Sequence, residues 1–203
     1  MTSIPLSVPP GQYVPTADER VVMYGVSWEH YELMLEVRGE RSQPRMAYLD
    51  GALELMTTSH GHEGVNFMVS RMLEAYALDA NIRFRGYGHW TLRKGAEKQA
   101  GIESDECYQF GDDQTERMPD LAIEVTWTSG GIDKLEIYRR LGVREVWFWE
   151  GGEILVFLLE GDRYERRAKS TFVPDLDLSL VARLVEQPTI NDAVRELRAA
   201  MKR

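Results

Sequence analysis

Apolar residues recur at helical spacing in one long segment of the chain. Between residues 65 and 76 they fall at i, i+3, i+4, i+7, i+8 and i+11, which forms one continuous stripe on a helix. Ser27 is a suitable cap for an earlier helix that begins at Trp28. Asp133 opens a later one that runs to Leu141 and ends at Gly142, a favourable residue after a helix. The long stripe consists of Val65, Met68, Val69, Met72, Leu73 and Tyr76.

Short apolar runs between these segments predict strands. RMAYLD and ALELMT flank Asp50-Gly51, and REVWFWE and EILVFLLE flank Gly151-Gly152, so each pair is expected to form a hairpin. RYERRA follows as a further strand. LAIEVTW, at residues 121–127, is almost entirely apolar and β-branched apart from Glu124. This composition is typical of a central strand that is covered on both faces.

Weaker patterns lie between the long helix and this central strand. Residues 82–93 alternate and contain Gly86 and Gly88, which indicates a strand pair or one bent strand. Residues 94–106 are expected to be a polar loop and residues 107–110 a short strand. The capping-box spacing of Thr189 and Asp192 predicts a C-terminal helix.

This order of elements predicts an α/β fold, with a mixed β-sheet flanked by α-helices. We expect an irregular, Pro-rich N-terminal arm at residues 1–24 and one domain at residues 25–185. A C-terminal helix at residues 186–203 is expected to pack on the same domain. A length of 203 residues agrees with a single domain of this kind.

Composition excludes several classes of protein. The formal net charge is −9, so the chain is not expected to coat nucleic acid by bulk charge, although a local basic groove could coexist with catalytic carboxylates. Cys107 is the single cysteine and cannot form an internal disulfide. The N-terminus lacks the pattern of a signal peptide, and no apolar run approaches the length of a membrane span. We therefore expect a cytoplasmic protein that does not enter a membrane.

The candidate chemistry lies in an acidic region between residues 103 and 124. Asp105 stands at the entrance to a short strand, and Glu124 lies inside the most apolar strand, where a carboxylate is costly unless it is paired or binds a cation. Lys134 follows in the first turn of the next helix and can reach back toward Glu124. Two carboxylates and an ammonium in one cleft suit a Mg²⁺ site that hydrolyses phosphoesters. A purely structural ion pair between Glu124 and Lys134 or an arginine is equally compatible with the sequence.

Other motifs have simpler explanations. The HGHE segment at residues 60–63 does not have the spacing of the two-histidine zinc helix, and Cys107 resembles a packed thiol more than a nucleophile. Trp147, Phe148 and Trp149 could stack on bases, but core packing is the commoner role. Gly130-Gly131 lacks the spacing of a phosphate loop, so no nucleotide cofactor is expected. The most basic stretch could follow a phosphate backbone or form a solvated strand face, and it contains Arg83, Arg85, Arg93, Lys94 and Lys98.

The segment PDLAIEVTWTSGGIDKLEIYRRLGVREVWFWEGG, with ESDECYQF before it, resembles the Uma2 family of restriction-endonuclease-like proteins. YLDGALELMTTSHGHEGVNFMVSRMLEAY is similar to the N-terminal hairpin and long helix of that family. The resemblance covers roughly residues 25–170. It implies the fold of the PD-(D/E)xK nuclease superfamily.

The resemblance also implies roles for individual residues. Asp105 in SDECY and Glu124 in AIEV match the two metal-binding acids, and Lys134 in DKLEIY matches a basic residue moved from strand to helix. Glu63 in GHEG matches a helix acid that can complete the metal site, with His62 a weaker candidate. The usual lysine position of the superfamily is Thr126 here, so catalysis depends on Lys134 reaching the cleft. Asp120, in a literal Pro-Asp pair, is the alternative metal acid.

These residues imply a Mg²⁺- or Mn²⁺-dependent endonuclease that hydrolyses phosphodiester bonds of DNA. The resemblance implies a homodimer, and an apolar hairpin at residues 145–158 could supply its interface or pack inside the monomer. A non-catalytic module that binds nucleic acid or protein while retaining the nuclease fold is the alternative. Acidic net charge and the missing lysine at position 126 favour that alternative.

Overall fold

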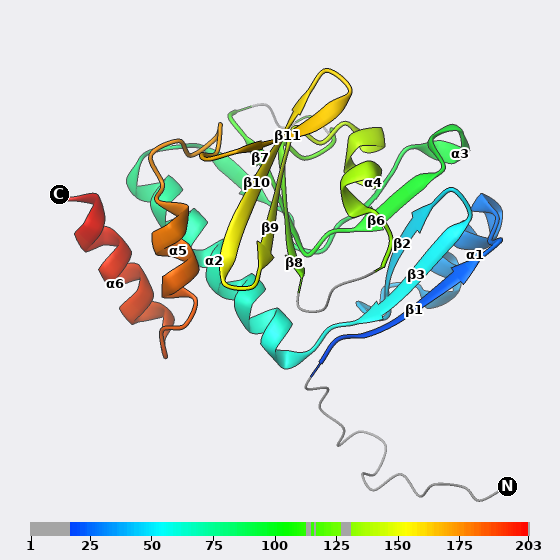
Figure 1. Cartoon of the computed structure of the whole chain (residues 1–203), viewed down its shortest axis with the longest axis horizontal. Helices are drawn as coiled ribbons and strands as arrows, with labels where there is room; N and C mark the ends of the chain where they lie inside the picture. The colour runs from blue at the N-terminus through cyan, green and yellow to red at the C-terminus, as the bar shows by residue number, and fades with distance from the viewer. Residues whose placement is uncertain (1–16, 113–114, 116, 127–130, 203) are drawn as a thin grey trace, which may run out of the picture.

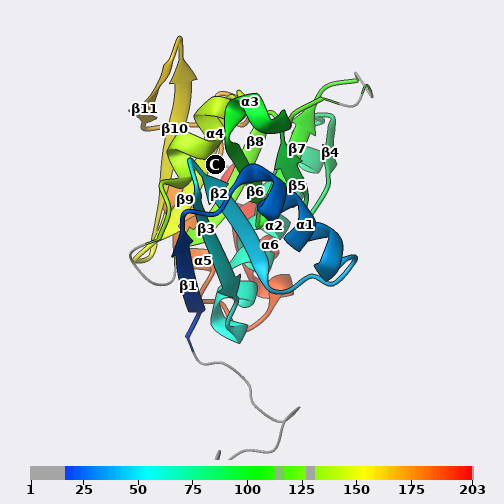
Figure 2. The same ribbon diagram turned by 90° about the vertical axis from the view of Figure 1, so that its right-hand side faces the viewer.

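The computed structural model describes residues 17–112, 115, 117–126 and 131–202, and its strands form two sheets (Figures 1 and 2). The first sheet has the order β1 (Glu19–Tyr24), β3 (Ala52–Thr57), β2 (Arg45–Leu49), β6 (Ala100–Glu103), β5 (Thr91–Arg93). The second has the order β11 (Arg163–Arg167), β10 (Glu153–Glu160), β9 (Glu145–Glu150), β8 (Leu121–Thr126), β7 (Glu106–Phe110), β4 (Phe84–Gly86).

The central strand of the second sheet is β8, whose residues 121–125 are buried. It pairs with β9 in parallel, whereas the other strand pairs of the described residues are antiparallel. The connection from β8 to β9 passes through α4 (Lys134–Leu141), as a parallel pair requires. Asp133 caps α4 by accepting from the backbone N–H of Glu136 at 3.0 Å. The predicted apolar strand and the helix that follows it are therefore confirmed.

Helices cover the second sheet on both faces. The apolar stripe of α2 (His60–Asp79) packs with α5 (Leu178–Leu184) and α6 (Ile190–Met201) on one face, around Ile123 and Trp147. On the other face α4 packs between the two sheets, where Tyr138 and Leu141 meet Ala122 of β8 and Ile102 of β6. The remaining face of the first sheet carries α1 (Trp28–Arg38), capped by Ser27 as expected. The expected mixed α/β architecture with flanking helices is confirmed, with its strands divided between two sheets.

Several local predictions were wrong. Residues 19–24, expected in the irregular arm, form β1 and pair with β3. The prediction failed because this edge strand exposes Val21 and Tyr24, so its apolar and polar residues do not alternate along the chain. The predicted polar loop at 94–106 contains α3 (Gly95–Lys98) and β6, a single helical turn and a four-residue strand that are too short to leave a clear period. Residues 82–93 form neither a strand pair nor a bent strand. They supply β4 and β5, which pair with different neighbours in different sheets.

The two hairpins and the C-terminal helix are present. Register pairs Leu49 with Ala52 across the first turn and Glu150 with Glu153 across the second, and β11 adds the expected third strand. α6 begins after its Thr189 cap and packs against α2. No described helix has both the length and the apolar composition needed to cross a membrane.

Candidate active site

Glu124 and Lys134 meet at the C-terminal end of β8. The Lys134 Nζ lies 2.5 Å from the Glu124 Oε2, and the Tyr138 hydroxyl donates to the other carboxylate oxygen. Glu124 is fully buried, whereas the Lys134 side chain is 15% exposed. Burial raises the pKa of the Tyr138 hydroxyl well above its usual range, and the Glu124 charge adds to the effect. Tyr138 therefore stays a hydrogen-bond donor, and Lys134 reaches the cleft from the first turn of α4.

Asp105 lies at the adjoining position on the neighbouring strand. β7 pairs Glu106 with Ile123, so the antiparallel register continued by one residue sets Asp105 opposite Glu124. The backbone N–H of Val125 donates to the Asp105 Oδ2 at 2.7 Å, which fixes this carboxylate beside the end of β8. Asp105 is fully buried. The structure thus brings together the three residues Asp105, Glu124 and Lys134 that the sequence singled out.

A buried histidine joins Asp105 to a second carboxylate. His62 Nε2 lies 3.0 Å from the Asp105 Oδ2, and its Nδ1 lies 2.9 Å from the Asp18 Oδ2. Asp18 also accepts from the backbone N–H of Ser59, which caps α2. Burial lowers the pKa of His62, and the charges of Arg45 and Lys134 act in the same direction, whereas Asp18 raises it. Both ring nitrogens of His62 therefore contact a carboxylate, one of Asp18 and one of Asp105.

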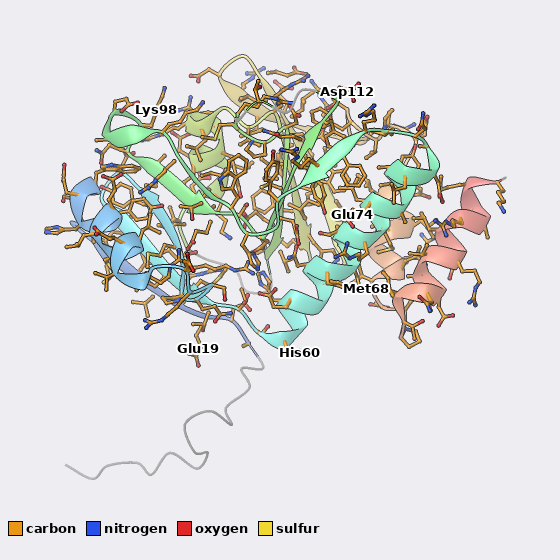
Figure 3. The ribbon with its side chains drawn as sticks, turned by 180° about the vertical axis from the view of Figure 1, so that it is seen from behind. Glu19, His60, Met68, Glu74, Lys98 and Asp112 are labelled. Carbon is orange, nitrogen blue, oxygen red and sulfur yellow. The ribbon has the colours of Figure 1, made fainter. Side chains whose placement is uncertain are left out.

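Arg45 connects Asp105 to the predicted helix acid. It opens β2 with 4% of its surface exposed, and its guanidinium pairs with Asp105 and, at 2.6 Å, with the Glu63 Oε1. The same Glu63 oxygen accepts from the Thr58 hydroxyl at 2.5 Å. Glu63 lies in the first turn of α2, near the helix end labelled by His60 in Figure 3. One guanidinium thus separates Glu63 from Asp105.

The alternative acid, Asp120, lies apart from this group. It precedes β8 by one residue, and four residues of extended strand, roughly 13 Å, separate it from Glu124. Its carboxylate receives two hydrogen bonds from Arg117, at 2.6 and 2.7 Å, and one from the backbone N–H of Phe110 at 2.8 Å. These contacts fix the start of the strand. The structure therefore gives Asp120 a structural setting.

The donor set fits a Mg²⁺ or Mn²⁺ ion that keeps part of its hydration shell. Within residues 17–112, 117–126 and 131–202, no three His, Cys, Asp or Glu side chains gather closely enough to hold a metal by themselves. Mg²⁺ does not need such a cage, because it is usually bound by one or two carboxylates together with waters and substrate phosphate. Asp105 and Glu124, which are opposite each other when the strand register is extended by one residue, are the two carboxylates available for this purpose.

Sequence reasoning missed three residues that complete the site: Arg45, Tyr138 and Asp18. Each contacts an acid or histidine that lies at least fourteen residues away. A fourth, His89, lies 3.2 Å from a guanidinium nitrogen of Arg45. The only usable signal was Tyr138, which lies one helical turn after Lys134 and so shares its face.

Glu106, next to Asp105 in the chain, has a carboxyl group that is a weaker acid than an ordinary glutamate. It opens β7 directly after Asp105, and burial together with the nearby Glu74 raises its pKa to about 7. Glu74 projects from the part of α2 that is labelled in Figure 3. Glu106 therefore carries less negative charge near neutral pH than its residue type suggests.

Cys107 is expected to be inert toward thiol reagents in the folded protein. Its side chain is fully buried in β7, and burial raises the pKa of the thiol to about 12. Because the thiolate is the reactive form, modification with a chromogenic disulfide should be slow in buffer and complete in denaturant. Rapid labelling of the native protein at pH 8 would contradict this assignment.

The aromatic candidates lie together in β9, whereas the basic candidates are divided between the two sheets. Trp147 is fully buried against α2, with Trp149 on the same face and Phe148 on the other, so Trp147 has the core role that is commoner for such residues. The basic stretch is divided between the sheets: Arg83 and Arg85 belong to the β4 region, whereas Arg93, Lys94 and Lys98 surround β5 and α3. These cations therefore do not follow one strand edge.

Comparisons with known proteins show the family and the fold. A family model described as "Uma2: Putative restriction endonuclease" matches residues 28–188. Among solved structures, a match covers 81% of this chain and 98% of the other, with 15% identity and a TM-score of 0.50. That protein is described as a putative nuclease belonging to DUF820, from Anabaena variabilis ATCC 29413. At this identity the likeness shows the fold. A comparison with curated proteins finds no match.

Proposed function

The chain belongs to the Uma2 family of restriction-endonuclease-like proteins, and from that premise we propose that it is a Mg²⁺-dependent endonuclease that hydrolyses phosphodiester bonds of DNA. One observation carries the proposal. Asp105, directly before β7, contacts the backbone of β8 at Val125, and Lys134 of α4 contacts Glu124 of β8 one residue earlier. Two carboxylates beside an ammonium are the groups needed to hold a divalent cation and to stabilise charge on a phosphoryl group.

In this proposal Asp105 and Glu124 hold the metal, and Glu63 contributes directly or through a water. A bound Mg²⁺ or Mn²⁺ ion would polarise a phosphoryl oxygen and lower the pKa of a water molecule. Tyr138 donates to one oxygen of Glu124 and so orients its carboxylate. The backbone N–H of Val125 does the same for Asp105. In this proposal these contacts hold each carboxylate in a fixed orientation before substrate arrives.

Lys134 supplies the positive charge that the strand lacks. Position 126, two residues beyond Glu124 on the same face of β8, is Thr126, and Lys134 reaches Glu124 from α4 instead. Its ammonium can hold the attacking water or neutralise charge that develops on the phosphoryl oxygens. We also propose that the protein works as a homodimer, because each protomer contributes one site and a duplex has two strands to cut.

The proposal is tested by incubating the purified protein with plasmid and single-stranded DNA in Mg²⁺, in Mn²⁺ and in chelator. We expect metal-dependent cleavage by the wild type and none by Glu124→Gln, which retains the shape of the side chain but not its charge. Glu153→Gln, an exposed glutamate of β10, is the matched control and should cleave normally. Calorimetry should show Mg²⁺ binding to the wild type that Glu124→Gln lacks. Absence of both cleavage and millimolar metal binding would refute the proposal.

A second candidate function is a non-catalytic interaction module. The observation in its favour is that both acids already have a cationic partner, Arg45 for Asp105 and Lys134 for Glu124, and that His62 also contacts Asp105. If these contacts are purely structural, Glu124→Ala should destabilise the fold, because it removes one partner of a buried pair. The module would then bind DNA or protein in chelator as tightly as in Mg²⁺, and no condition would yield cleavage.

A further inference from the structure

A pocket opens beside the candidate metal acids, on the face of the second sheet that carries α4. Its volume is about 280 Å³, just below the range of drug-sized ligand sites, which is roughly 300–1,000 Å³. We call it the Phe148 pocket. Its lining includes Lys134, Leu135, Phe148, Leu155, Phe157 and Arg20.

Strand register connects this pocket directly to Glu124. Glu124 is the parallel partner of Phe148, and Phe148 is the antiparallel partner of Leu155. Partners in register place their side chains on one face of a sheet. A single row therefore runs from Glu124 across β9 to β10, and its second and third members line the pocket. β8, β9 and β10 lie side by side in this order (Figure 1).

The pocket exists because α4 covers only part of this face. Tyr138 and Leu141 lie over the earlier residues of β8 and β9, Ala122 and Val146. The strands continue to Thr126 and Glu150, beyond the first turn of the helix. Phe148, Leu155 and Phe157 remain partly exposed there. This is the carboxyl end of a parallel strand pair, where ligands of α/β proteins commonly bind.

The lining is chemically suited to a flat, neutral group. Phe148 and Phe157 contact each other edge to face, with ring centroids 5.9 Å apart, and Leu135 and Leu155 add aliphatic surface. Arg20 and Lys134 are balanced by Asp133 and Glu150, so the rim has both donors and acceptors without a net formal charge. Nucleobases stack on aromatic side chains and form hydrogen bonds through their edges.

We propose that the Phe148 pocket takes one nucleobase of the DNA strand, next to the phosphate that lies at Asp105 and Glu124. This inference rests on the proposed nuclease function and adds a substrate requirement to it. Lys134 faces both the pocket and Glu124, so a base in the pocket would place its own phosphate beside the acids. A base inside a duplex is stacked on both faces and cannot enter, so the substrate must present an unpaired or extruded base.

Binding without catalysis tests the pocket separately from the chemistry. The probes are fluorescent 12-mer oligodeoxynucleotides, one for each of the four homopolymers, and a 12-mer of abasic residues with the same phosphates, in chelator. We expect the wild type to bind at least one homopolymer about tenfold more tightly than the abasic strand, since one base–aromatic stack contributes about 1–3 kcal/mol. Leu155→Trp fills the pocket and should remove this preference. Phe157→Ala, which removes one wall, should reduce it.

The control is Leu33→Trp, which places the same bulk on the exposed face of α1, away from the pocket. It should bind the five probes as the wild type does. Circular dichroism melting identifies any variant that does not fold, and Phe157→Ala decides the outcome if Leu155→Trp is lost. Equal affinity of the wild type for base-containing and abasic strands would overturn the inference, as would an unchanged preference in a folded Leu155→Trp. Either result would leave metal-dependent cleavage by the wild type intact, whereas absence of both cleavage and metal binding would refute the nuclease proposal and not base binding in the pocket.

Discussion

Lys134→Met is expected to slow DNA cleavage by about 10²–10³-fold, the range typical of removing one group that stabilises charge in the transition state. The substitution keeps an unbranched side chain, one atom shorter, and removes the ammonium that lies 2.5 Å from Glu124. Mg²⁺ binding should survive, because Asp105 and Glu124 are unchanged. Single-turnover cleavage rates at saturating metal, together with calorimetry, measure the two effects separately.

Two further variants complete this test. Lys98→Met removes an exposed lysine of α3 and should leave the rate unchanged. Lys134→Arg retains a positive charge and should recover part of the lost rate. If Lys134→Met cleaves as fast as the wild type, the ammonium has no role in the reaction, and its pair with Glu124 is structural.

Arg45→Met is expected to lower the free energy of unfolding by about 3 kcal/mol, because removal of one partner from a buried ion pair leaves an uncompensated charge. The guanidinium is almost fully buried and contacts both Asp105 and Glu63. Without it, Asp105 retains His62 and the Val125 N–H but loses its permanent cation. Urea unfolding of the variant and the wild type in chelator measures the difference.

Mg²⁺ distinguishes Arg45 from an ordinary structural arginine. A divalent cation at Asp105 should restore part of the lost stability in Arg45→Met, since a ligand that binds the native state alone stabilises it. Arg38→Met is the matched control, because Arg38 pairs with the buried Glu103 at 2.6 Å outside the site. It should also be destabilised, but Mg²⁺ should not restore it. Equal recovery in the two variants would show that the metal acts elsewhere.

The parts of the site that were predictable from sequence are those encoded by local patterns. Glu124 was recognisable because it interrupts a strand that is otherwise apolar, and Lys134 because it follows a helix cap. Both lie in one strand–helix unit, where spacing along the chain translates directly into proximity. Asp105 was singled out at the entrance to a short strand and by the family resemblance, and the structure pairs that strand with β8 in antiparallel orientation.

The contacts that neutralise the site were not predictable in this way. Arg45 comes from the other sheet, and its position depends on how the two sheets meet around α4. Asp18 precedes an edge strand that the sequence did not reveal. Asp120 is the converse case: its Pro-Asp motif made it a candidate, and the structure pairs it with Arg117, three residues earlier. Charge pairing between distant segments is a property of the tertiary structure, and a single sequence carries little trace of it.

The ion pair between Arg45 and Asp105 also has an evolutionary consequence. Arg45 belongs to the first sheet and Asp105 immediately precedes a strand of the second, so this contact fastens the two halves of the fold to each other. A substitution at either position would alter both the candidate metal site and the contact between the two sheets. A lineage that lost the need for catalysis would still be constrained to keep these side chains, and their persistence among descendants would be weak evidence of retained activity.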